Sequence, residues 1–182
     1  RENNKSRKKG QSYINCYAIA SNGNKVITDS SDNFCVLWDL NTCEIIRKLS
    51  GHTQSVTSVA ITPDGEKAIS GSLDNNCILW NLMTGEILTT LKGHSGFVSA
   101  LSITPDGKKA ISSSSDNTCI LWDLSSDILL KKYEFQVAHK VFFIENETTG
   151  LFISNTFPTR TTHIDLTSGK QKRGSAGSSF NV

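Results

Sequence analysis

A histidine, a serine and an aspartate stand at the same spacing twice in this chain, as His52, Ser70 and Asp74 and again as His94, Ser112 and Asp116. These are the residue types of a Ser-His-Asp hydrolase, in which the histidine activates the hydroxyl and the carboxylate orients the histidine. An active site needs no second copy, however, and neither a nucleophile-elbow motif nor an oxyanion-hole glycine run accompanies either set. We therefore expect these residues to be structural and the chain not to be an enzyme.

The spacing between the two sets is the period of most of the chain. Three tryptophans, Trp38, Trp80 and Trp122, lie 42 residues apart, each inside an apolar run. Gly51-His52 recurs as Gly93-His94, and the Thr-Pro-Asp-Gly segment at 62–65 recurs at 104–107. A fixed period of this length indicates an array of one small structural unit.

Each period predicts four short strands. In the clearest copy, residues 56–61 are β-branched and partly alternating, and residues 67–72, 77–82 and 86–91 have similar patterns. The intervening Pro-Asp-Gly presets a tight turn, since proline fixes φ and glycine accepts a positive φ. A four-stranded sheet of this size cannot bury both faces alone. It must stack on copies of itself, and radial stacking gives a propeller.

The period divides the chain into units predicted at 10–48, 49–91, 92–131 and 132–173, between a basic flank at 1–9 and a tail or further blade start at 174–182. The fourth unit is degenerate, because Ile164 stands where a tryptophan is expected. The chain begins without Met and stops within the pattern, so we expect a fragment of a longer protein. Three arrangements remain open: further blades outside this chain, two chains that close an eight-blade ring, or an open array.

The order Gly-His, Pro-Asp-Gly, Ser-x-x-x-Asp and Trp-Asp resembles the WD-repeat β-propeller family. The resemblance covers roughly residues 10–170 and is strongest over 49–124. It implies an all-β propeller, partial or four-bladed, with four-stranded antiparallel blades. It also implies a buried hydrogen-bonded network in each unit, in which every polar group has a partner. The network residues are His52, Ser70, Asp74, Trp80, His94, Ser112, Asp116 and Trp122, with Thr28, Asp32 and Trp38 in an incomplete first unit.

WD-repeat propellers resemble scaffolds that take a protein or peptide on the loop face of the ring, where positions that vary between units are the informative ones. The varying positions are Tyr13, Gln54, Ser55, Leu73, Phe97 and Ser115. Phe97 and Leu73 are apolar where a solvated loop prefers polar residues, which suits a protein contact; the alternative is that Phe97 packs beneath its own blade. We therefore predict a non-catalytic interaction scaffold. The alternative is the sensor region of a larger signalling or effector enzyme whose catalytic domain lies outside this chain.

The composition bounds cofactors, location and other partners. The sequence has no GxGxxG, P-loop, CxxC or His-x-His motif, so we expect no cofactor and no metal. No apolar run approaches the ~18–20 residues of a membrane span. Cys35, Cys77 and Cys119 share one position of the repeat and fit small buried hydrophobes in a reducing, cytoplasmic setting.

The charge is segregated along the chain. The net charge is +2, but five Lys or Arg residues gather in residues 1–9 and three more in residues 170–173, which leaves the body acidic. An acidic body argues against nucleic-acid binding by the blades. The basic flanks are either solvated or contact nucleic acid or an anionic surface.

Overall fold

The computed structural model describes residues 14–29, 32–126, 128–134, 140–144, 149–154, 160–166, 168 and 170–173. All regular structure in these residues is β-strand. The strands are β1 (Tyr17–Ile19), β2 (Lys25–Asp29), β3 (Phe34–Asp39), β4 (Glu44–Ser50), β5 (Val56–Ile61), β6 (Lys67–Ser72), β7 (Cys77–Asn81), β8 (Ile87–Leu91), β9 (Val98–Ile103), β10 (Lys109–Ser114), β11 (Thr118–Asp123), β12 (Ile128–Glu134), β13 (Lys140–Ile144), β14 (Thr149–Ser154), β15 (Arg160–Asp165) and β16 (Gln171–Arg173).

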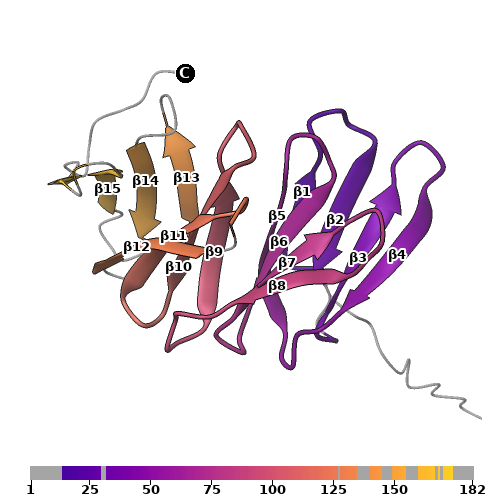
Figure 1. Cartoon of the computed structure of the whole chain (residues 1–182), viewed down its shortest axis with the longest axis horizontal. Helices are drawn as coiled ribbons and strands as arrows, with labels where there is room; N and C mark the ends of the chain where they lie inside the picture. Colours follow the sequence, from indigo (N-terminus) through magenta and orange to yellow (C-terminus); the bar gives the residue numbers. More distant parts are fainter. Residues whose placement is uncertain are drawn as a thin grey trace, which may run out of the picture.

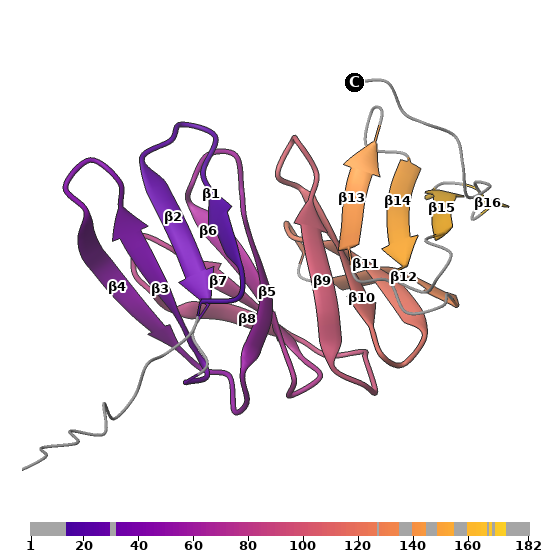
Figure 2. The ribbon, with the colours of Figure 1, turned by 180° about the vertical axis from the view of Figure 1, so that it is seen from behind.

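Each group of four consecutive strands forms one antiparallel sheet in chain order. The sheets stand side by side, with β1–β4 at one end of the molecule and β13–β16 at the other (Figure 1). The first strands of successive sheets, β1, β5, β9 and β13, contact one another in that order. The view from behind shows the same row of sheets, which does not close into a ring (Figure 2). The prediction of an all-β fold with four-stranded antiparallel blades is confirmed.

The turns form where the sequence places turn residues. Gly65 has φ +72° and donates its N–H to Thr62 O at 2.8 Å, and the Thr62 hydroxyl oxygen accepts the Lys67 N–H at 3.0 Å. The same geometry recurs at Gly107, with φ +73°. At the next turn Asn75 adopts φ 71°, a left-handed conformation that asparagine tolerates better than most residues. The repeated turn sequence therefore sets the repeated strand spacing.

The strand ends differ slightly from the sequence prediction. Strand β7 ends at Asn81, and β8 begins at Ile87, each one residue inside the predicted range. The reason is local, because the Asn81 N–H donates to Glu86 O at 2.9 Å and so closes the turn. Strands β4 and β12 run to Ser50 and Glu134, slightly beyond the predicted ends of their units. The division into units remains a prediction.

The core lies between the sheets. Ile27, Leu37 and Leu49 of the first sheet pack against Val59 and Trp80 of the second. A second cluster joins sheets two and three, and a third joins sheets three and four. Cys35, Cys77 and Cys119 are fully buried in these clusters. Stacking thus buries the facing sides of neighbouring sheets.

Candidate interaction site and the polar network beneath it

The predicted network residues of the second unit lie within hydrogen-bond distance of one another. His52 Nδ1 lies 2.8 Å from Asp74 Oδ2, and His52 Nε2 lies 2.8 Å from Ser70 Oγ. The Trp80 indole N–H donates to Ser70 Oγ, also at 2.8 Å. One neutral tautomer satisfies every atom: Ser70 donates its hydroxyl proton to Nε2, and the Nδ1–H donates to the carboxylate. The network joins four different segments of one blade.

Each segment has a distinct role in building this network. His52 lies on the connection from β4 to β5, Ser70 on β6, Asp74 in the β6–β7 turn and Trp80 on β7. The glycine before the histidine leaves room for its neighbours, since a Cβ at Gly51 would lie 2.7 Å from Ile87 Cδ1 and 3.0 Å from Trp80 Cη2. The connection can therefore cross close over the tryptophan and carry the histidine to the serine.

The third unit repeats the arrangement. His94 Nδ1 lies 3.1 Å from Asp116 Oδ2, His94 Nε2 lies 2.8 Å from Ser112 Oγ, and Trp122 Nε1 donates to Ser112 Oγ at 2.8 Å. The Thr118 hydroxyl adds a bond to Asp116 Oδ1 at 2.6 Å. The sequence analysis missed Thr118, whose counterpart one period earlier is Asn76, a residue that also binds the turn aspartate.

Electrostatics favour a carboxylate beside a neutral imidazole. Burial alone would raise the pKa of Asp116, but hydrogen bonds from Thr118, the Ser95 N–H and His94 hold that pKa far below its usual range. Burial would likewise raise the pKa of Asp74, but bonds from the Thr53 N–H and His52 lower it below its usual value. Burial lowers the pKa of His94, although the neighbouring Asp116 opposes the shift.

The serines of both sets are inaccessible. Ser70 and Ser112 have 0 % relative exposure, and the His52 side chain has only 1 %. A substrate carbonyl cannot approach either hydroxyl, and nucleophilic attack requires that approach. The geometry is that of a satisfied buried polar network and does not support the chemistry of a hydrolase triad.

The first unit holds only part of the network. Trp38 Nε1 donates to Thr28 Oγ1 at 3.0 Å, while Asp32 is exposed in the β2–β3 turn. A different carboxylate is buried here: Asp29, 1 % exposed, accepts the backbone N–H groups of Asn15 at 2.7 Å and Cys16 at 2.8 Å. The sequence analysis missed Asp29. The only sign of it in the sequence is an acidic residue at a repeat position where the later units have Gly71 and Ser113.

The loop end of the second and third blades, made by the β4–β5, β6–β7, β8–β9 and β10–β11 connections, carries five of the predicted partner residues, of which Ser55 and Ser115 are half-buried. The Leu73 N–H donates to Ser55 O at 3.0 Å, and the Ser115 N–H donates to Phe97 O at 3.0 Å. Leu73 is 39 % exposed and Phe97 is 42 % exposed, so Phe97 does not pack beneath its own blade. Gln54 is exposed beside them, and Tyr13 lies outside the described residues.

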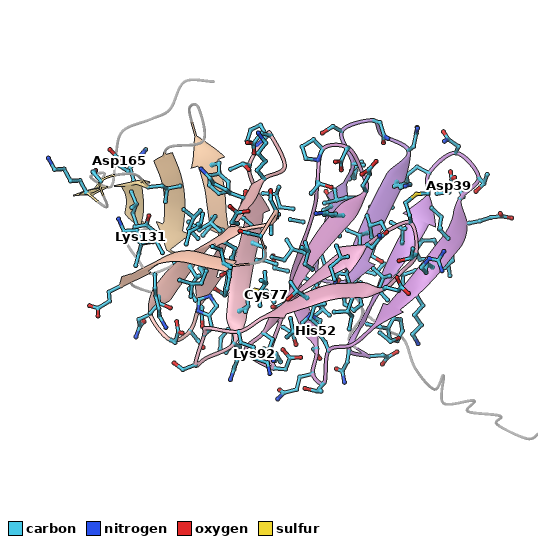
Figure 3. The ribbon with its side chains drawn as sticks, viewed as in Figure 1. Asp39, His52, Cys77, Lys92, Lys131 and Asp165 are labelled. Atoms are coloured by element: carbon cyan, nitrogen blue, oxygen red, sulfur yellow. The ribbon has the colours of Figure 1, made fainter. Side chains whose placement is uncertain are left out.

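Leu73 and Phe97 flank the junction between two blades. The Thr57 hydroxyl donates to Val98 O at 2.5 Å, and a Cβ at Gly71 would lie 2.9 Å from Val98 Cβ. The end of β6 therefore meets the start of β9. Leu73 directly follows β6, and Phe97 directly precedes β9. His52 lies at the same end, opposite the end where Asp39 and Asp165 lie (Figure 3).

Fold and network together define a tandem array of four-stranded antiparallel blades with a repeated internal hydrogen-bond network. The family model described as WD domain, G-beta repeat matches residues 4–39, 43–81 and 85–123, which is more than half of the chain. The chain belongs to this family, as the sequence predicts. WD40 repeats generally mediate protein–protein interaction, and such domains are generally non-catalytic. A comparison with curated proteins finds no match.

The described residues contain no helix of the length and apolarity that a membrane span requires. Within the same residues, no three His, Cys, Asp or Glu side chains are grouped so that they could hold a metal ion.

Proposed function

We propose that this chain is a non-catalytic scaffold that binds a protein or peptide on the loop end of its second and third blades. The observation that carries the proposal is the pair Leu73 and Phe97. Both are large apolar side chains, both are substantially exposed, and each is fixed by a backbone hydrogen bond at the same inter-blade junction. Apolar and aromatic anchors of this kind account for much of the affinity of protein interfaces.

The loops that carry these anchors are held in place by the network beneath them. Asp74 Oδ2 accepts the Thr53 N–H at 3.0 Å, and Asp116 Oδ2 accepts the Ser95 N–H at 2.9 Å. The Ser72 hydroxyl donates to Gln54 O at 3.0 Å. A ligand that meets these loops orders few groups on binding, which lowers the entropic cost of association.

The chemistry of the surface defines the ligand class. Leu73 and Phe97 favour an apolar side chain, and the exposed amide of Gln54 can both donate and accept hydrogen bonds. We propose a peptide or loop with one apolar anchor flanked by uncharged polar groups. The free cysteines, three of them buried, suit a reducing compartment, and we propose that the protein acts in the cytoplasm.

Site-specific photo-crosslinking tests the surface directly. Peptides are selected from a displayed library against the immobilised chain, and a photoreactive phenylalanine then replaces Phe97 in one variant and Leu88 in another. Leu88 is the matched control, since it is equally exposed at 42 % but lies on the outer strand β8. The proposal predicts crosslinks to selected peptides at 97 and not at 88. Crosslinks at 88 alone would show that the binding surface lies elsewhere.

A further inference from the structure

Two lysines stand at the loop end of the third blade, beside the connection that carries Phe97. Lys92 begins this connection directly after β8 and is exposed at the same end of the molecule as His52 (Figure 3). Lys132, on the outer strand β12, donates from Nζ to Gly93 O at 3.0 Å, and its side chain remains 41 % exposed. One end of the connection thus carries positive charge, and the other end carries an apolar side chain.

The polar network of a blade does not require these cations. In the second blade, the residues one period earlier are Ser50 and Thr90, which are uncharged. The same network forms there nevertheless, with each of its hydrogen bonds at 2.8 Å. The two lysines therefore add charge to a connection that is already held in place.

The acidic groups near the lysines differ in their exposure. Lys132 Nζ lies 3.9 Å from Asp116 Oδ2, but the same oxygen accepts the Ser95 N–H and lies 3.1 Å from His94 Nδ1. The Asp116 side chain is only 5 % exposed. Glu134, two residues further along β12, is exposed and opposes the attraction of an anion. A ligand that approaches from solvent thus meets the lysines more directly than the buried carboxylate.

The order of the strands sets the distance between the charge and the apolar anchor. The third sheet has the order β12-β11-β10-β9, and neighbouring strands lie about 4.8 Å apart, so β12 lies roughly 14 Å from β9. The Lys132 side chain leans from β12 toward Gly93, which shortens this span. An extended peptide rises about 3.3 Å per residue and covers the distance in about three to four residues.

We propose that the peptide ligand carries an acidic side chain about three to four residues from its apolar anchor, and that Lys92 and Lys132 bind this carboxylate. This proposal rests on the proposed function, because it requires the anchor to contact Leu73 and Phe97. The uncharged polar groups of the ligand then lie between the two contacts. Exposed ion pairs add little affinity, but they select a partner and fix its register.

Fluorescence anisotropy on a set of labelled peptides tests the spacing. Each peptide carries the anchor of a peptide selected against this chain and a single glutamate, which is moved through every position on either side of the anchor. The affinity is expected to be highest when the glutamate is about three to four residues away, and this advantage should decrease as salt is added. An affinity that is independent of the position of the glutamate overturns the proposal.

Substitutions that copy the second blade test the lysines. Lys92→Ser combined with Lys132→Thr is expected to weaken the best acidic peptide about fivefold and to leave its glutamine version unchanged. The melting temperature should stay close to the wild-type value, because the second blade folds with these residues. Lys131→Thr is the matched control: it removes an exposed charge from the opposite face of β12 and should change neither affinity. Equal losses for the two peptides in the double variant overturn the proposal.

Phe97→Ser distinguishes failure of this contact from failure of the proposed function. A loss of affinity for both peptides in Phe97→Ser, with no effect of the lysine substitutions, would show that the loop end binds the anchor and that the acidic contact is wrong. No loss for either peptide in Phe97→Ser would overturn the proposed function, and the acidic contact with it.

Discussion

The imidazole of His52 and the carboxylate of Asp74 meet at 2.8 Å although they are 22 residues apart in the chain. The contact ties the β4–β5 connection to the β6–β7 turn, so it holds together the two loops that frame the exposed end of the second blade. His94 and Asp116 repeat it at 3.1 Å in the third blade. We therefore expect the stability of each blade to depend on these buried pairs, as does the proposed presentation of a ligand by the two loops.

Removing one partner of this pair should destabilise the blade. Asp74→Ala leaves the His52 Nδ1–H and the Thr53 N–H without their acceptor, and an unsatisfied buried donor costs about 1–3 kcal/mol. Urea denaturation followed by tryptophan fluorescence measures the loss. Glu86→Ala removes an exposed carboxylate from the same blade and should change the free energy of unfolding by less than about 0.5 kcal/mol. Equal midpoints for Asp74→Ala and the wild type would refute the structural role.

Lowering the pH should destabilise the fold in two separate pH ranges. Because burial lowers the pKa of His94, the unfolded chain takes up a proton near pH ~6.5 that the folded chain does not, and stability falls below that pH. The pKa values of Asp74 and Asp116 are also below their usual range. Their contribution is complete above the unfolded pKa of ~3.9 and is lost as pH falls further.

Thermal melting between pH 8 and pH 3 checks the sign of both effects. His94→Gln removes the titrating imidazole and should flatten the decrease between pH 7 and pH 5 relative to the wild type. The steeper loss below pH 4 should remain in this variant, because the carboxylates are unchanged. A wild type that gains stability as pH falls from 7 to 5 would contradict the account.

The junction between the second and third blades should not tolerate a methyl group at Gly71. A Cβ there lies 2.9 Å from Val98 Cβ and closer to its Cγ1, so Gly71→Ala overpacks the interface and should cost about 1–3 kcal/mol. Val98→Ala opens space at the same point. In a double-mutant cycle, Val98→Ala should recover part of the loss, with a coupling energy of about 0.5 kcal/mol or more. Additive effects would show that the two residues are not in contact.

Thiol reactivity should distinguish one cysteine from the other four. Cys43 is exposed, whereas burial raises the pKa of Cys35 and Cys77 to about 12 and also raises the pKa of Cys16 and Cys119. Because the thiolate is the reactive form, a maleimide at neutral pH should label Cys43 alone in the native chain. Mass spectrometry of the peptides identifies the site, and labelling of Cys77 before unfolding would contradict the packing.

The repeated features of this molecule could be predicted from sequence, and the single ones could not. Trp80 and the Pro63-Asp64-Gly65 turn recur one period later, so the sequence itself reports that they belong to a common unit. Asp29 occurs once, and its burial follows from an N-terminal segment that no later unit repeats.

Contacts between blades also could not be predicted from the sequence. The sequence analysis predicted Leu73 and Phe97 as separate varying positions, but their common junction depends on Val98 packing against β6. The exposure of Tyr17 likewise depends on stacking, because no sheet precedes it among the described residues, whereas its counterpart Val59 is buried against the preceding sheet. Periodicity defines a unit, whereas the surface left uncovered is a property of the array.

The most direct test of the proposed function is the affinity of a selected peptide for Phe97→Ser, measured by titration calorimetry well below the melting temperature. If Phe97 anchors the ligand, its removal should cost about 2 kcal/mol, or roughly thirtyfold in affinity. The melting temperature should stay close to the wild-type value, because the side chain is exposed. An unchanged affinity in a folded Phe97→Ser chain would contradict binding on this loop end.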